Sequence, residues 1–194
     1  MIGPEEVLGF WLDETGPDGW FKADDAFDAE IRDRFQEAWE HVMAGGYSLW
    51  LTYPSGTLAY VILTDQFSRN MFRGTAKAFA SDRVALAAAK SAVDKGWDRK
   101  IDEPARVMFY LPLMHSENLC DQDRCVRLIH ERMPVNGGEY LPHARAHREE
   151  IRQFGRFPSR NKALSRATTA AEAAYLERGG YGATMRELQL QKAS

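Results

Sequence analysis

The sequence predicts a single all-α domain of roughly eight to ten helices. Apolar residues recur at helical spacing over long stretches, as in Phe27, Ile31, Phe35 and Trp39. Segments of about 10 to 20 residues are separated by short turns containing Gly or Pro, which is typical of antiparallel helix pairs. No segment alternates between polar and apolar residues for long enough to indicate a sheet.

Length and composition favour one domain of ordinary size. The chain has 194 residues, of which 44% are hydrophobic, so it can build a full core without disulfides or metal ions. We expect the domain to span residues 1–182, with residues 183–194 forming a C-terminal helix or a frayed tail.

Charge and hydropathy exclude several classes of partner. A net charge of −3 disfavours a general polyanion binder, so no nucleic-acid partner is expected. The longest apolar run, Leu58–Leu63, is far short of the ~20 residues of a membrane span, so no membrane partner is expected. Glu5 and Glu6 stand where a signal peptide needs basic residues. The two cysteines match no zinc or disulfide pattern, and reduced thiols fit a cytoplasmic protein.

The first helices are bounded by recognisable signals. Pro4 at a first helical turn predicts a short helix that continues to Leu12. Asp24 is expected to cap a long helix that reaches about Ala44, where Gly45 ends it.

A buried helix is predicted over about Thr57–Phe67. Its core, Leu58–Leu63, has no polar face, and a helix that is apolar on all sides is buried. This helix carries Asp65 out of the middle of the core, and we expect it to break near Ser68.

The remaining helices are predicted from caps and from Gly or Pro stops. The first runs from Ser81 or Asp82 to Gly96, and the second from Glu103-Pro104 to a break at Pro112. Two more are expected over about 117–132 and about 139–154, the latter with Gly155 as its stop. The last two run from a capping box at Thr169–Glu172 to Gly179, and over 183–194.

Three polar phrases resemble one known family: Asp65–Asn70 (DQFSRN), Tyr110–Glu117 (YLPLMHSE) and Arg156–Asn161 (RFPSRN). Shorter matches are Phe10-Trp11, Trp20-Phe21 and Ala78–Asp82. Over about residues 7–178 the chain is similar to an uncharacterised bacterial family, known as a domain of unknown function with a tetratricopeptide-like helical fold. The resemblance implies an array of antiparallel helix pairs and implies no activity.

One position departs from the pattern of that family. Ser159 stands where the family has histidine, so a role for an imidazole there does not carry over. The family pattern includes His147 but not His143.

The leading functional hypothesis is a binding protein for a small anionic molecule or a peptide carboxylate, held in an arginine-lined groove between helices. Residues 145–166 carry seven Arg or Lys and two Glu. The alternative for these arginines is a set of salt bridges to acids such as Asp65, Glu117 and Asp121. The candidate ligand-binding residues are Gln66, Arg69, Asn70, Arg73, Asn118, His147, Arg156, Arg160 and Asn161.

The rival hypothesis is a small hydrolase or lyase. His115 would be the general base, Glu117 its orienting partner, and Asp65 a carboxylate whose pKa burial has moved. Against this, a buried Asp65 needs a partner, and an ion pair with Arg69 or Arg73 would provide one. A third interpretation is that all the polar clusters are structural.

A metal site is a further alternative on one helix. His143, His147 and Glu150 fall within a ~60° sector and could hold a divalent ion. The competing interpretation makes His147 a hydrogen-bonded core histidine. No cofactor is predicted, because no Gly-rich phosphate loop and no Gly-x-Ser-x-Gly elbow are present.

We expect Asp65, one of His115 and Glu117, and one of Arg156 and Arg160 to lie in one polar patch. The helix that carries Asp65 has no solvent-exposed face, so an unpaired carboxylate there would be buried at a high cost in free energy. The shared Ser-Arg-Asn ending of two phrases predicts two similar turns. An enclosed patch would indicate a structural network, and a cleft would indicate a ligand site. The sequence indicates no oligomeric state.

Overall fold

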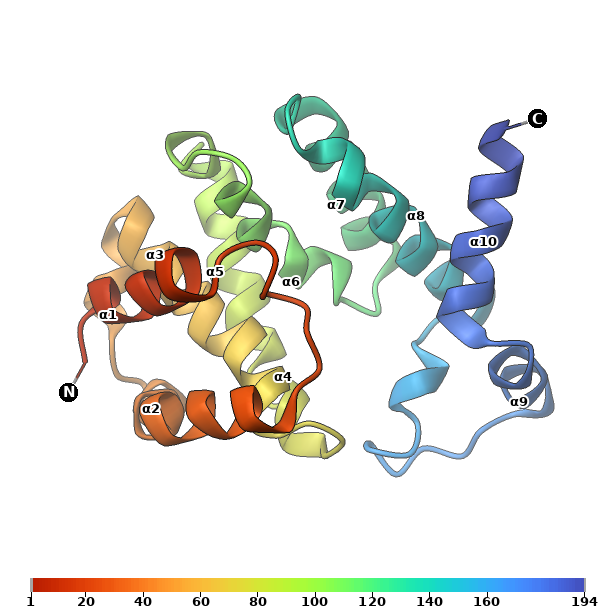
Figure 1. Cartoon of the computed structure of the whole chain (residues 1–194), viewed down its shortest axis with the longest axis horizontal. Coiled ribbons are helices and arrows are strands. Elements are labelled where there is room, and N and C mark those ends of the chain that lie inside the picture. The colour runs from red at the N-terminus through yellow and green to blue at the C-terminus, as the bar shows by residue number, and fades with distance from the viewer. Residues whose placement is uncertain (1, 194) are drawn as a thin grey trace. The chain divides into compact units, whose positions relative to one another are not determined.

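The structure is a computed structural model that describes residues 2–193, apart from the side chains of residue 189 and residues 191–193. The fold is all-α, as predicted, and the described residues include no strand. The chain divides into two compact units, Met1–Pro112 and Leu113–Ser194. The single domain over residues 1–182 stays a prediction, and each unit is described by itself (Figure 1).

The first unit is built from short and long helical segments around α3. Its elements are α1 (Pro4–Leu8), a π-helical turn (Gly9–Thr15), α2 (Asp25–Met43), a 3-10 turn (Ser48–Thr52), α3 (Pro54–Val61), a second π-helical turn (Ile62–Phe67), α4 (Ser68–Met71), a 3-10 turn (Ala76–Phe79), α5 (Asp82–Asp94), and 3-10 turns at Asp98–Lys100 and Ala105–Phe109. Helix α3 packs against α1 and α5, and α2 packs against α4.

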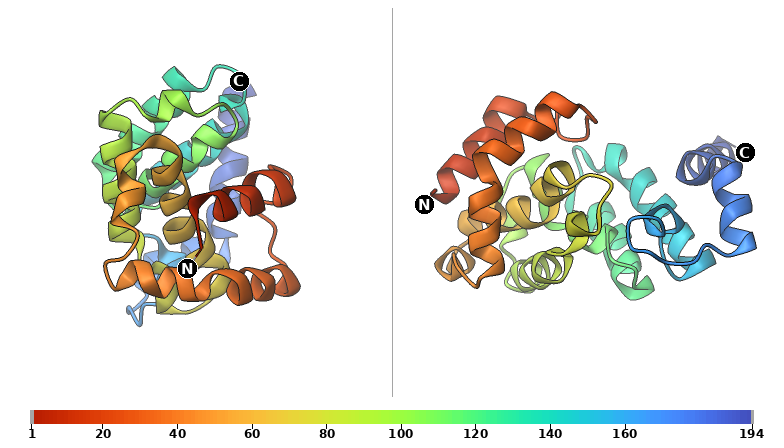
Figure 2. Two further views of the ribbon diagram at one scale, coloured as in Figure 1. Left: turned by 90° about the vertical axis from the view of Figure 1, so that its left-hand side faces the viewer. Right: turned by 90° about the horizontal axis from the view of Figure 1, so that it is seen from below.

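The second unit is centred on α8 and follows the short helix α6 (Leu111–Met114), which crosses the boundary between the units. Its elements are α7 (Leu119–Arg132), α8 (Gly137–Phe154), a 3-10 turn (Pro158–Arg160), α9 (Ala170–Glu177) and α10 (Gly180–Ala193). Helix α8 packs against both α7 and α10, which lie on either side of it in Figure 1. The right-hand view of Figure 2 shows the same unit from below. The predicted C-terminal segment therefore forms a helix in its described part.

The predicted caps and stops account for several boundaries. The Asp24 side chain accepts a hydrogen bond from Phe27 N at 2.8 Å, and Thr169 forms the predicted capping box with Glu172. Gly155 ends α8 with a φ of 67°, a conformation that glycine adopts without strain.

The predicted helix break near Ser68 is wrong, whereas the element before Pro112 does end close to that residue, at Phe109. Ser68 keeps helical dihedrals, with a φ of −57° and a ψ of −37°, so α3 continues through a π-helical turn into α4. The Ser68 hydroxyl donates to Thr64 O at 2.9 Å, which satisfies it inside the helix. Pro112 lies in the first turn of α6, where proline is tolerated because its missing N–H has no helical partner. The expected similarity of the two Ser-Arg-Asn turns also fails, because the first is α-helical and the second lies in a 3-10 turn and its C-cap.

The buried run on α3 is confirmed. Residues Leu58–Leu63 are at most 6% exposed. An aromatic cluster packs beside it, with Phe67 at 4.6 Å from Phe35 and 5.2 Å from Trp11 between ring centroids. Trp11 also accepts a hydrogen bond at its backbone oxygen from Trp20 Nε1 at 2.7 Å. This apolar interior is what surrounds Asp65 and forces it to find partners.

Within the described part of the chain, no helix is both long enough and apolar enough to span a lipid bilayer. The tetratricopeptide-like pairing of the helices stays a prediction.

Candidate functional site

Asp65 lies in the interior of the first unit, with 0% of its surface exposed. Its carboxylate accepts a hydrogen bond from Gln66 Nε2 and lies 3.6 Å from Arg69 Nη1. Arg69 donates two further hydrogen bonds to Asp82, at 2.9 and 3.2 Å. Of the two partners predicted for Asp65, the structure has Arg69, so the buried charge is neutralised within its own unit.

Asn70 and Arg73 converge on a different carboxylate, that of Asp28. Asn70 Nδ2 donates to Asp28 Oδ1 at 2.7 Å, and Arg73 donates to both carboxylate oxygens at 2.5 and 2.8 Å. Burial works to raise the pKa of Asp28, but the hydrogen bonds from Arg73 and Asn70 outweigh it and hold the pKa below its ordinary value. Asn70 and Arg73 thus hold the end of α4 to α2.

Glu117 joins the start of α7 to the turn after α8. Arg166 donates to both carboxylate oxygens of Glu117, at 2.7 and 3.0 Å, and Phe157 N donates to Oε1 at 2.8 Å. Burial works to raise the pKa of Glu117, and these hydrogen bonds reverse the effect and lower it. Asn118 caps α7, because its Oδ1 accepts from Cys120 N at 2.9 Å. Glu117 and Asn118 therefore both have structural partners.

Arg156 and Asn161 hold the start of α9. Arg156 donates to both oxygens of Glu172 at 2.6 and 2.8 Å, and this lowers the pKa of Glu172 to about 2. Asn161 donates to Glu172 at 3.3 Å and accepts from Arg166 Nε at 3.0 Å. These contacts fix the turn from which Arg160 projects.

Arg160 lies among aromatic rings and main-chain oxygens. Its Nη2 donates to His115 O at 2.9 Å, and its guanidinium carbon lies 4.4 Å from the centre of the Phe157 ring. The side chain is partly exposed, as is that of His115. The main-chain carbonyl and the aromatic face hold this guanidinium in a defined plane.

His147 is the neutral centre of this region. Its Nδ1 donates to His143 O at 2.9 Å, so Nε2 is the acceptor of the neutral ring. Burial lowers the pKa of His147 to about 3, and the positive charge of Arg160 adds to the effect. The ring centre lies 4.9 Å from Tyr181, 5.5 Å from Phe157 and 6.4 Å from His115. Within the part of the chain that the structure describes, Nε2 has no hydrogen-bond partner.

Tyr181 at the start of α10 covers the two histidines of α8. Its hydroxyl forms a short hydrogen bond with His143 Nδ1, and the two rings are stacked at 6.1 Å. Burial raises the pKa of Tyr181 to about 12, with a contribution from the negative charge of Glu150. The phenol therefore stays protonated at neutral pH.

Glu150, on the same helix as these histidines, is only 3% exposed. Burial raises its pKa to about 7, although a hydrogen bond from Tyr175 and the charge of Arg160 oppose the rise. The Tyr175 hydroxyl also bonds to Thr184 Oγ1 at 3.1 Å, so α8, α9 and α10 meet at this point. We call the group formed by His115, His147, Glu150, Arg160 and Tyr181 the Arg160 face.

The metal interpretation is not supported by this geometry. The described residues contain no group of three or more His, Cys, Asp or Glu side chains that could hold a metal ion. In particular, His143 is bound to Tyr181 and His147 turns Nδ1 to the backbone. The alternative in which His147 is a hydrogen-bonded histidine is the arrangement observed.

Tyr181 and Gln122 were not predicted as members of this region. Tyr181 follows the Gly179-Gly180 pair, and the sequence gives no sign that α10 returns to α8. Gln122 is fully buried, and its Nε2 donates to Met114 O and Ser116 O at 2.6 and 2.7 Å. Gln122 thereby fixes the backbone on either side of His115, while its Oε1 has no partner among the described residues.

The predicted residues thus belong to two separate groups. Asp65, Gln66, Arg69, Asn70 and Arg73 lie in the first unit. Those of the second unit are His115, Glu117, Asn118, His147, Arg156, Arg160 and Asn161. The meeting of Asp65 with Arg156 or Arg160 in one patch stays a prediction.

Comparisons with known proteins give a family and a fold. Residues 7–180 match the family described as bacterial protein of unknown function (DUF924). The chain is also similar to a solved structure of a protein of unknown function from Agrobacterium tumefaciens, with a TM-score of 0.85 and 41% sequence identity. The match covers 91% of this chain and 97% of the other. No curated protein matches the chain.

Proposed function

The chain belongs to the DUF924 family of bacterial proteins of unknown function, and we propose that it is a binding protein for a small anionic molecule or a peptide carboxylate. The Arg160 face is the proposed site. The observation that carries the proposal is that a positioned guanidinium, Arg160, and a neutral acceptor, His147 Nε2, belong to side chains that both lie against the Phe157 ring.

The two groups together favour a particular ligand chemistry. Arg160 supplies donors that suit a carboxylate, and an arginine fork binds a carboxylate more strongly than a neutral donor does. The lone pair of His147 Nε2 repels a second anionic oxygen and accepts from an O–H or N–H. A carboxylate beside a hydroxyl, amine or amide N–H satisfies both groups, as at the C-terminus of a peptide.

Three other predicted arginines donate hydrogen bonds to carboxylates of the chain itself. Arg69 and Arg73 donate to Asp82 and Asp28 in the first unit, and Arg156 donates to Glu172. Anion binding by these residues would require breaking charge-assisted hydrogen bonds. The proposal also includes the tetratricopeptide-like arrangement and a cytoplasmic location.

A binding screen tests the proposal. Purified protein is titrated with lactate, alanine and a dipeptide, and thermal unfolding is followed, because a ligand that binds only the folded state raises the melting temperature. We expect a saturable rise that Arg160→Gln abolishes. The matched control is Arg152→Gln, because Arg152 lies on the exposed side of α8 and pairs with Glu149. No rise with any of these compounds, or equal rises in both variants, would contradict the proposal.

A small hydrolase or lyase remains the alternative. The ion pairs of Asp65 and Glu117 disfavour both as acid–base groups, whereas Glu150, with its pKa raised to about 7, suits such a role. His115→Gln separates the two functions, because a binding site tolerates a side chain of similar size and a general base does not. Turnover of a bound compound that His115→Gln and Glu150→Gln abolish would establish the enzyme. The purely structural interpretation predicts neither binding nor turnover.

A further inference from the structure

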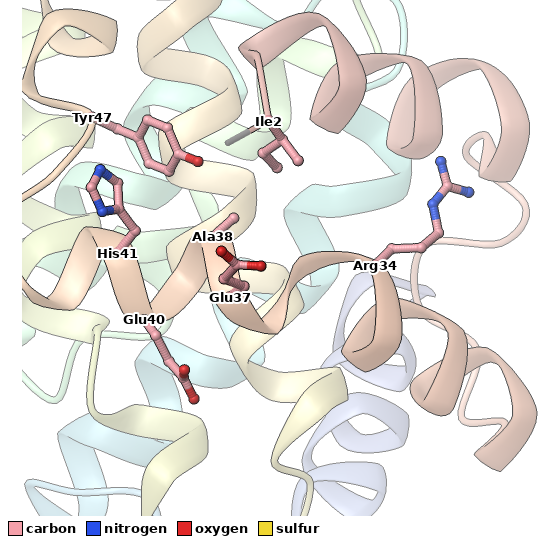
Figure 3. A pocket seen from close by; sticks show the side chains of 7 residues that line it. All are labelled: Ile2, Arg34, Glu37, Ala38, Glu40, His41 and Tyr47. Atoms are coloured by element: carbon pink, nitrogen blue, oxygen red, sulfur yellow. The ribbon is translucent and has the colours of Figure 1, made fainter.

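A cavity of about 300 Å³ lies in the first unit, beside the C-terminal half of α2. Its lining residues are Ile2, Arg34, Glu37, Ala38, Glu40, His41 and Tyr47. Figure 3 shows the Glu37 carboxylate and the Tyr47 ring approaching the same space from α2 and from the loop after it. We propose that this cavity is a binding site for a small organic cation with an ammonium head. The proposal is independent of the Arg160 face.

The electrostatics of the lining favour a cation. Glu37 forms no hydrogen bond or ion pair with any residue that the structure describes. Glu40 accepts from Gln36 and lies 3.7 Å from Lys77, a pair in which both side chains are about half exposed and therefore weakly coupled. Among the described residues, the exposed Glu37 carboxylate of this cavity thus has no positive partner.

The one arginine of the lining does not cancel this charge. Arg34 donates to Glu14 at 2.8 Å and to Glu30 at 3.4 Å, and its guanidinium lies 4.3 Å from the centre of the Phe10 ring. Figure 3 shows its side chain directed away from Glu37 and Tyr47. Arg34 is therefore neutralised at the far end of the cavity.

Helix α2 adds negative potential at the same place. The helix ends at Met43, so Glu37 and Glu40 lie in its last two turns. The C-terminal end of a helix is the negative end of its dipole, where cations are stabilised and carboxylates are destabilised. Two carboxylates three residues apart also repel each other on one helix face. A bound cation would relieve both effects.

Tyr47 provides an aromatic wall in an unusual backbone conformation. Its φ is 57° and its ψ is 22°, a left-handed conformation that is rare for a bulky side chain. One side of its ring stacks on Trp50 at 4.2 Å, and the His41 ring meets it edge-on at 4.7 Å. The pKa of Tyr47 is raised by burial and by the charge of Glu37, so the phenol is neutral and close to that carboxylate.

The position of His41 depends on a missing side chain. A Cβ on Gly46 would approach the His41 ring atoms to 2.2 Å, so only glycine allows the ring to lie beside Tyr47. An aromatic wall facing a carboxylate is a general solution for binding ammonium groups, because the ring face attracts the cation and the carboxylate balances its charge. The strained Tyr47, the close approach at Gly46 and the repelling carboxylates all meet at this cavity.

Amide NMR spectra recorded during titration test the proposal. The probes are tetramethylammonium chloride and methylammonium chloride, with sodium chloride at equal ionic strength and tert-butanol as a neutral compound of similar shape. We expect saturable shifts of the amide signals of Ala38 and Tyr47 with at least one of the two ammonium salts. Tighter binding of tetramethylammonium would indicate an aromatic-cage site for methylated ammonium, and tighter binding of methylammonium would indicate a hydrogen-bonding site for a primary amine.

Substitutions of Glu37 and Tyr47 test which side chains of the cavity bind the cation. Glu37→Gln should weaken binding roughly tenfold or more, since it removes the charge while keeping the size. Asp33→Asn is the matched control, because Asp33 is exposed on the same helix but does not line the cavity. Tyr47→Asn, which suits the left-handed backbone, should also weaken binding and provides a second test. Equal affinity in Glu37→Gln and Asp33→Asn, shifts reproduced by sodium chloride or tert-butanol, or no shifts at all would overturn the proposal.

Discussion

The two segments that end in Ser-Arg-Asn, Phe67–Asn70 in the first unit and Phe157–Asn161 in the second, differ in what surrounds them. The first is part of a continuous helix in an apolar core, and its arginine and asparagine bind aspartates of neighbouring helices. In the second, Arg160 turns to a main-chain oxygen and an aromatic ring, and this ring also contacts the neutral His147. Identical residues thus serve packing where the backbone is helical and buried, and provide a candidate site where a turn brings them to a partly exposed surface.

The largest expected effect concerns the buried carboxylate of the first segment. Asp65→Ala should lower the free energy of unfolding by about 3 kcal/mol, because it leaves the Gln66 amide and part of Arg69 without their buried partner. Urea unfolding monitored by tryptophan fluorescence measures the change. Asp123→Ala removes an exposed ion pair with Arg148 and should cost less than about 0.5 kcal/mol. Equal costs for the two variants would contradict the structural role of Asp65.

The second prediction concerns the pH dependence of stability in the second unit. The pKa of Glu150 is about 7 in the folded chain against an ordinary 4.5, so between these pH values the folded state holds a proton that the unfolded state has lost. Glu150 therefore makes stability fall as pH rises across this window, by up to about 3 kcal/mol. Glu150→Gln should remove that fall. Urea unfolding of the wild-type protein and of Glu150→Gln at pH 4.5 and at pH 7.5 measures this fall. An equal change in unfolding free energy with pH in the two proteins would show that Glu150 is well solvated.

The third prediction concerns the link between α7 and the turn after α8. Glu117→Gln keeps an acceptor for Phe157 N but loses the charge that pairs with Arg166. We expect a loss of about 1–2 kcal/mol in unfolding free energy, as for a charge-assisted hydrogen bond. Glu131→Gln, on the exposed side of α7, serves as the control and should change little. An unchanged unfolding free energy in Glu117→Gln would show that the ion pair between Glu117 and Arg166 does not stabilise the fold.

The all-α class could be predicted because it rests on local signals. Asp24, the capping box at Thr169 and the glycine stop at Gly155 act within a few residues, and each is found where the sequence indicates it. The break near Ser68 could not be judged in this way, because tertiary packing holds that segment helical against its turn-like composition. The burial of Leu58–Leu63 followed from the absence of a polar face.

The candidate site was predicted only in part because its members come from distant segments. His115, His147 and Arg160 could be selected by residue type, yet the return of α10 that brings Tyr181 onto His147 has no local signal. The partner of Arg156 is Glu172, sixteen residues away on α9, which no spacing rule indicates. The raised pKa of Glu150 likewise could not be predicted, because it is caused by burial, which depends on how the helices pack.

The comparison of the two arginines tests the central claim most directly. Arg69→Gln and Arg160→Gln are matched changes, and the claim is that the first arginine holds the core while the second presents a binding group. Urea unfolding should show a loss of about 3–5 kcal/mol for Arg69→Gln, which removes the positive charge beside a buried aspartate, and about 1 kcal/mol for Arg160→Gln. An equal or greater loss for Arg160→Gln would contradict the account and make the second segment structural as well.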